Sequence, residues 1–245
     1  MTTSTEAPVK KVSTSETGHF KNLANFSALI ESVKKYGPLY NPSNANLSIS
    51  SLESLRDRID AAMSAVADTE IAHRNTVRER QEAYEGMSSL ATRIQNAFAS
   101  CATKNEAANA KSYTDKIRGD RKKKTVEATD EKSKSTSQLS FDNRMKNLRD
   151  YCSFLGTIPA YKPNETDLQS ASILTYIESL ESLNDAVNKT WNDLDIARVE
   201  RDRLLYNDNT GATAIAQSVK SYVKSVYGTK SEEYTRISGI RFYKK

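Results

Sequence analysis

A proline-containing turn occurs twice in this sequence, with the same residue types at the same spacing. The stretch "YGPLYNPSNANL" covers residues 36–47, and "TIPAYKPNETDL" covers residues 157–168. The shared residues lie 121 positions apart: Pro38 and Pro159, Tyr40 and Tyr161, Pro42 and Pro163, Leu47 and Leu168. Proline cannot continue a helix, and it disfavours helical geometry in the residue before it. Two such turns therefore predict two similar helix–turn–helix arrangements in one chain.

The same offset relates the apolar positions that follow each turn. Leu52, Leu55, Ile59, Ala62 and Val66 correspond to Ile173, Tyr176, Leu180, Leu183 and Val187. Their spacing alternates between three and four residues, which places each set on one face of a helix. The sequence thus predicts a tandem duplication. Its expected segments are a flexible N-terminal arm (1–19), helical repeat 1 (20–121), a charged linker (122–139) and helical repeat 2 (140–245).

Each repeat is expected to form three helices, which makes the fold all-α. The expected ranges are 20–36, 47–85 and 87–119 with a break near Thr103, then 140–156, 168–207, 212–227 and a short helix at 231–237. Asn46 and Asp167 precede the long helices and are expected to cap them. Tyr40 and Tyr161 are expected to pack back on the bundle. The linker contains neither Gly nor Pro, so a solvated helix is the alternative to a flexible connection there.

Gly86 and Gly211 follow the long helices and suit helix termination or a tight turn. We expect a chain reversal at each, so that long antiparallel helices pack as a four-helix bundle or a coiled-coil core. The alternative is that the chain passes straight through Gly86 and forms one longer rod.

The composition limits the possible classes of protein. Of the 245 residues 37% are hydrophobic, and the formal net charge of +5 comes from 36 basic and 31 acidic residues. So small an excess argues only weakly for an acidic partner. The N-terminus has no apolar run typical of a signal peptide, and no 18 apolar residues are consecutive. Cys101 and Cys152 lack metal-binding spacing, so we expect free thiols in a cytoplasmic protein.

Five residues of the long helices are candidates for chemistry or for the core. Glu70 and His73 have the spacing of a di-iron carboxylate motif, but such a site needs two of these motifs, and only one is present. Arg80 and Arg201 fall near the apolar stripe. They are expected to form an interhelical ion-pair belt, with a polar groove for an acidic ligand as the alternative. Trp191 is expected in the core. Because nucleotide-binding loops and catalytic constellations are lacking, we expect no enzyme, no cofactor and no metal.

Two surfaces are candidates for binding. The first is a basic cluster that could contact nucleic acid or anionic lipid; it comprises Lys116, Arg118, Arg121, Lys122, Lys123 and Lys124. The second is an apolar C-terminal surface, expected to make contacts within the chain or between subunits. It comprises Val219, Tyr222, Val223, Val226, Tyr227, Ile237, Ile240, Phe242 and Tyr243.

These features favour a structural or interaction protein that self-assembles into homo-oligomers or filaments through long amphipathic helices, with a protein partner as a further possibility. A membrane-active helical protein, forming pores or remodelling lipid, is one alternative. A nucleic-acid-associated protein that uses the basic cluster is the other.

The second half of the chain resembles a group of short bacterial helical proteins. The resemblance rests on Y-x-P-N-E at 161–165 and on "VKSYVKSVYGTKSEEYTRISGIRF" at 219–242. In that group a proline turn precedes a long helix, and a basic-aromatic stretch closes the unit. In the first half, Ser43 and Asn44 replace the Asn-Glu pair. The resemblance implies the fold and no particular activity.

Overall fold

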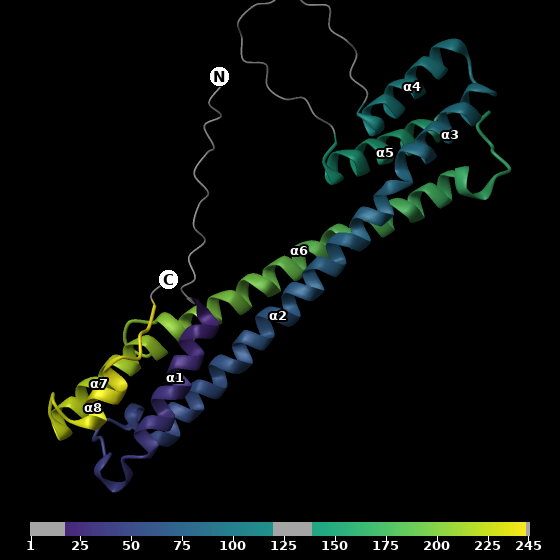
Figure 1. Cartoon of the computed structure of the whole chain (residues 1–245). Coiled ribbons are helices and arrows are strands. Elements are labelled where there is room, and N and C mark those ends of the chain that lie inside the picture. The colour runs from purple at the N-terminus through teal and green to yellow at the C-terminus, as the bar shows by residue number, and fades with distance from the viewer. Residues whose placement is uncertain (1–17, 120–138, 244–245) are drawn as a thin grey trace, which may run out of the picture. The chain divides into compact units, whose positions relative to one another are not determined.

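The computed structural model describes residues 18–119 and 139–243 of the chain, and this part contains helices without any strand (Figure 1). The predicted all-α class is therefore confirmed. The elements, in order, are α1 (His19–Lys34), η1 (Gly37–Leu39), η2 (Ala45–Leu47), α2 (Ile49–Glu85), α3 (Met87–Ala99), α4 (Lys104–Arg118), α5 (Phe141–Leu155), η3 (Thr166–Leu168), α6 (Ser170–Tyr206), α7 (Ala212–Tyr227) and α8 (Glu232–Ser238). The break near Thr103 occurs as predicted, because Thr103 and Glu106 form a reciprocal capping box that starts α4.

The chain divides into two compact units that do not follow the two halves of the sequence. Unit 1 comprises residues 1–68 and 195–245, and unit 2 comprises residues 69–194. The long helices α2 and α6 each contribute one end to each unit. Each unit therefore combines the beginning of one predicted repeat with the end of the other. Most of the predicted N-terminal arm and linker lies outside the described residues.

The core of unit 1 is formed by apolar side chains from both ends of the sequence. The buried members on α1 and α2 are Phe26, Leu29, Ile30, Val33, Leu52, Ile59, Ala62 and Met63, and those on α6, α7 and α8 are Leu204, Leu205, Ala212, Ile215, Ala216, Val219, Val223 and Ile237. On α1 they recur every three or four residues, so one face of the helix is buried. Helix α1 packs against α7, so segments from both ends of the sequence are needed to complete this core.

The core of unit 2 is formed in the same way by the remaining helices. Its buried members include Tyr84, Met87, Ala91, Ile94 and Phe98 on α2 and α3, Ala110 and Ile117 on α4, Leu148, Tyr151, Cys152 and Leu155 on α5, and Ile173, Ile177 and Leu180 on α6. Here α4 packs against both α3 and α5. The two units thus use the same order of elements, with α5 in the place of α1 and α3 in the place of α7.

The two proline turns have the same internal hydrogen bond. The hydroxyl of Tyr40 donates to the carbonyl of Leu47 at 2.7 Å, and that of Tyr161 donates to the carbonyl of Leu168 at 2.8 Å. All four side chains are buried. The prediction that both tyrosines pack back on the bundle is confirmed.

The predicted caps of the long helices are wrong. Asn46 lies inside η2, and the side chain that accepts a backbone N–H at the start of α2 is Ser48, which bonds the N–H of Ser51. Asp167 lies inside η3 and pairs with Arg93 on α3. The reason is that each turn ends in a short 3-10 helix, which moves the start of the long helix past the predicted capping residue.

The predicted reversal at Gly86 does not occur. Gly86 has helical angles, and the N–H of Leu90 bonds its carbonyl at 2.9 Å, so α3 continues the direction of α2. Contacts with the partner segments agree. The hydroxyl of Tyr176 donates to the carbonyl of Ala83, and Arg93 donates to Asp167. The residue number thus increases along α2 and α3 while it decreases along the facing segment. The two strings of helices are therefore antiparallel throughout unit 2, which is the rod alternative.

The chain does not fold back at Gly211 either. Tyr206, at the end of α6, contacts His19 at the start of α1, and Tyr227, at the end of α7, contacts Tyr36 just beyond α1. Helix α7 therefore runs along α1, and Figure 1 shows it leading away from the end of α6. The residues between α6 and α7 form a loop in which the N–H of Gly211 bonds the carbonyl of Asn207 at 2.9 Å.

The predicted core position of Trp191 is wrong, because its side chain is 52% exposed. The inward position of this helical turn is occupied by Thr190, whose hydroxyl lies 2.8 Å from that of Thr76 and 3.2 Å from Nδ1 of His73. A polar layer thus interrupts the apolar stripe of α2 and α6 in unit 2.

The shared turn generates the first prediction. Tyr40→Phe and Tyr161→Phe should each lower the free energy of unfolding by about 1–3 kcal/mol, because a buried carbonyl loses its donor. Tyr113→Phe is the matched control, since this half-buried ring stacks on Tyr151 and its hydroxyl has no hydrogen bond within the described residues. Urea unfolding followed by circular dichroism measures the difference. Equal effects of all three substitutions would contradict the assigned bond.

The buried tyrosines generate a pH prediction. Burial raises the pKa of Tyr151 to about 12 and also raises the pKa values of Tyr40 and Tyr161. In the unfolded chain a tyrosine titrates near pH 10. The neutral phenols therefore stabilise the fold fully below about pH 10, and this stability is lost as the pH rises towards the native pKa values. Tyrosinate absorbance should show a late phase that shrinks in Tyr151→Phe. Identical native and denatured titrations would refute the assignment.

The two glycines generate the third prediction. Gly86 is helical with open space around an added Cβ, so Gly86→Ala should stabilise the chain by about 0.5–1 kcal/mol. At Gly211 a Cβ would lie 2.5 Å from the backbone nitrogen of Asn207, so Gly211→Ala should destabilise by about 1–3 kcal/mol. Thermal unfolding should show a higher melting temperature for Gly86→Ala and a lower one for Gly211→Ala than for the unmodified chain. A change in the same direction for both variants would be inconsistent with the geometry.

Candidate binding pocket

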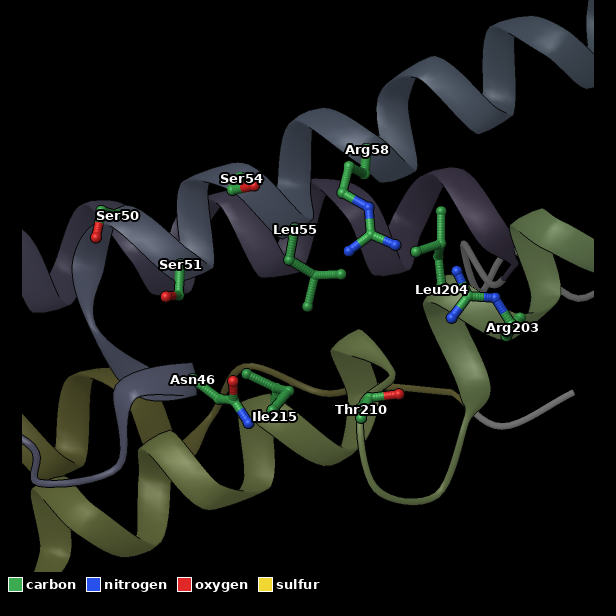
Figure 2. A pocket seen from close by; sticks show the side chains of 10 residues that line it. All are labelled: Asn46, Ser50, Ser51, Ser54, Leu55, Arg58, Arg203, Leu204, Thr210 and Ile215. Carbon is green, nitrogen blue, oxygen red and sulfur yellow. The ribbon is translucent and has the colours of Figure 1, made fainter.

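A cavity of about 490 Å³ in unit 1 lies between the first turns of α2 and the connection from α6 to α7 (Figure 2). It is lined by Asn46, Ser50, Ser51, Ser54, Leu55, Arg58, Arg203, Leu204, Thr210 and Ile215. This volume falls within the range of small-molecule sites.

Local sequence places the hydroxyl groups around this pocket. Serine is favoured where a helix begins, and Ser48 caps α2 while its hydroxyl donates to that of Ser51 at 2.9 Å. Ser51, Leu55 and Arg58 follow at helical spacing and share one face of α2. On the opposite side the side-chain oxygen of Asn207 accepts hydrogen bonds from the N–H and hydroxyl of Thr210, both at 3.0 Å. This fixes the loop that carries Thr210.

The lining contains two arginines and no carboxylate. Arg203 donates two hydrogen bonds of 2.7 Å to Glu200, and this pairing lowers the pKa of Glu200, which stays ionised. Arg58 forms no hydrogen bond or ion pair within the described part of the chain. Arg203 is therefore held in a direct ion pair, whereas Arg58 interacts with the Glu200 charge only at longer range and leaves its N–H donors free for a ligand.

Unit 2 has a cavity of about 500 Å³ at the corresponding place. It is lined by Glu82, Ala83, Gly86, Ser89, Leu90, Arg93, Asp167, Ser172 and Tyr176. Three of these residues, Asp167, Ser172 and Tyr176, lie 121 positions after Asn46, Ser51 and Leu55 of the first pocket. Its chemistry differs, because its one arginine pairs with Asp167 and Tyr176 donates to the carbonyl of Ala83.

Sequence reasoning did not find either pocket. The available signal was the alignment of Arg58 with Ser179, which places a charge on α2 where the second repeat has none. It was missed because one arginine on a charged helix is unremarkable until the facing loop is known.

The apolar C-terminal residues form part of the core of unit 1 rather than a free surface. Val219, Val223 and Ile237 are fully buried, and Tyr222, Tyr227, Ile240 and Phe242 pack against them. The N–H of Tyr243 donates to the side-chain oxygen of Asn22 at 2.9 Å. Only Val226, at 45% exposure, stays largely accessible. The physical reason is that α1 covers these side chains. The expected contacts within the chain are therefore formed, and most of these residues are not accessible for assembly with a second chain.

The predicted basic cluster is described only in part. Lys116 and Arg118 lie in the last turn of α4, and the ammonium group of Lys116 is 5.4 Å from the centre of the Tyr113 ring. Arg121, Lys122, Lys123 and Lys124 lie outside the described residues. Contact of this cluster with nucleic acid or lipid stays a prediction.

The predicted ion-pair belt is not formed. The guanidinium of Arg80 lies 4.1 Å from the centre of the Phe141 ring, and Arg201 pairs with its neighbour Asp202 on the same helix. Arg80 forms no ion pair within the described residues, and its guanidinium makes a favourable cation–π contact instead.

The motif of Glu70 and His73 does not act as a pair. Glu70 binds Arg74, and His73 contacts Thr190 and the ring of Trp191. Groups of three or more possible metal ligands are absent from residues 18–119 and 139–243.

Within the described residues, no helix combines the length and apolar character needed to cross a membrane. Comparisons of the whole chain with protein-family models, with curated proteins and with solved structures gave no match.

Proposed function

We propose that this chain is a non-catalytic structural or interaction protein that self-associates through its long helices into homo-oligomers or filaments. The observation that carries the proposal is that large apolar side chains are left exposed on α2 and α6. In unit 1 these are Ile196 and Val199, at 67% and 60% exposure. In unit 2 they are Ile71, Leu174 and Trp191.

The exposed residues of unit 1 have the geometry of a helix contact. Ile196 and Val199 are three positions apart on one helix, so their side chains are neighbours on its surface. Burying each against a second chain would stabilise association by about 1.5–3 kcal/mol. Charged residues flank them, as in helices that pair with a specific partner.

The cysteines support the proposed location. Cys101 is exposed and Cys152 is buried, and both are free thiols. Free thiols persist in a reducing compartment, so we place the protein in the cytoplasm.

The test is a double variant, Ile196→Glu with Val199→Glu. It should weaken self-association about tenfold or more, because the apolar contact is lost and charge is introduced. Light scattering on a size-exclusion column over a range of concentrations measures the effect. Electron microscopy of the same fractions identifies rings, rods or filaments.

The matched control is Ser179→Glu with Ser182→Glu, which adds the same charge to exposed polar positions of α6 in unit 2, away from Ile196, without removing apolar surface. It should associate like the unmodified chain. A 27.3 kDa monomer at every concentration of the unmodified chain would overturn the proposal. Equal weakening by both double variants would show that charge alone, and not the apolar pair, controls association.

A further inference from the structure

We propose that the pocket of unit 1 binds a small organic anion, a molecule with a phosphate or carboxylate group and an apolar part, and that Arg58 is the main contact for the anionic group. This inference is independent of the proposed self-association, because the residues that line the pocket do not include the exposed apolar residues Ile196 and Val199.

The electrostatic argument rests on the imbalance of charge at the pocket. The lining contributes two guanidinium groups and no carboxylate. Glu200 pairs with Arg203 through two hydrogen bonds, while Arg58 forms no hydrogen bond or close ion pair within the described residues and acts on Glu200 only at longer range. A guanidinium presents planar paired donors that match phosphate and carboxylate oxygens. Arg58 is exposed, so an anion entering the pocket would replace water on its guanidinium and gain two paired, charge-assisted hydrogen bonds.

The remaining lining groups define the rest of the ligand. Figure 2 shows the guanidinium of Arg58 directed from α2 towards the α6 side of the pocket, with Ser51 and Leu55 beside the same space. The hydroxyl of Ser51 accepts from Ser48 and can donate its own hydrogen to an oxyanion. Leu55, Leu204 and Ile215 provide apolar contact. A bare inorganic ion would leave these apolar groups unused, which is why we infer an organic anion.

Unit 2 provides an internal comparison. Its corresponding pocket has almost the same volume but contains Glu82 and Asp167. Its single arginine, Arg93, already pairs with Asp167. At the position that corresponds to Arg58 the second repeat has Ser179. Of these two cavities, the one in unit 1 has an arginine whose N–H groups form no hydrogen bond within the described residues, and the one in unit 2 does not.

The experiment is a calorimetric titration of the full chain in a phosphate-free buffer of constant ionic strength. The probes are phenyl phosphate and benzoate, which share an apolar ring and differ in the oxyanion. Saturable binding of either probe below about 10 mM is expected, and the stronger one identifies the preferred group. Absence of saturable binding by both probes would overturn the proposal.

Arg58→Gln should weaken binding about tenfold or more, because it removes the charge and the paired donors. Arg58→Lys should bind the probe more weakly than the unmodified chain and more tightly than Arg58→Gln, because lysine keeps the positive charge but lacks the planar pair of donors. The matched control is Arg78→Gln, which removes an exposed arginine from the same helix in unit 2, where it faces Glu82 at 3.7 Å. Equal weakening by Arg78→Gln and Arg58→Gln would mean non-specific attraction and would refute the site.

Discussion

Burial of the apolar stripes of α2 and α6 is the constraint on which the rest of this structure depends. Each helix has 37 residues, about 55 Å, and no residue of α2 between Met63 and Tyr84 is buried. The stripes are therefore covered separately at each end. In unit 1 the cover comes from α1 and α7, which lie near opposite ends of the sequence, and the hydrogen bond from Tyr36 to the carbonyl of Glu233 illustrates how distant these segments are. Neither half of the sequence contains a complete core.

The polar layer between the stripes has a structural role of its own. Thr76, Thr190 and His73 satisfy one another where leucine or valine would have continued the core. A partly buried polar contact between helices favours one register, since a shift would separate the hydrogen-bonding partners. The adjoining Trp191 contacts the ring of His73 and is exposed, and exposed apolar groups on long helices are the basis of the proposed self-association.

The two pockets show how one scaffold can carry different chemistry. Three lining residues of each are related by the 121-residue offset, so the turn and one face of the long helix contribute to both cavities. The charged residues are not repeated at this offset. Ser179 is at the position that corresponds to Arg58, and Asp167 is at the position that corresponds to Asn46. The difference in charge between the two cavities depends on a few residues of an otherwise similar frame, which explains why the turn could be recognised in the sequence and the pocket could not.

The sequence by itself determined the helices, their approximate ends and the packing of Tyr40 and Tyr161, because periodicity, proline and local spacing are properties of neighbouring residues. The tandem duplication remains a prediction. Tertiary structure decided what depends on distant segments. Gly86 continues a helix because α3 has an antiparallel neighbour to pack on, and Val219 is buried because α1 covers it. Arg58 borders a pocket because the loop after α6 lies opposite. Each of these outcomes is set by contacts between residues far apart in the chain, which no local pattern encodes.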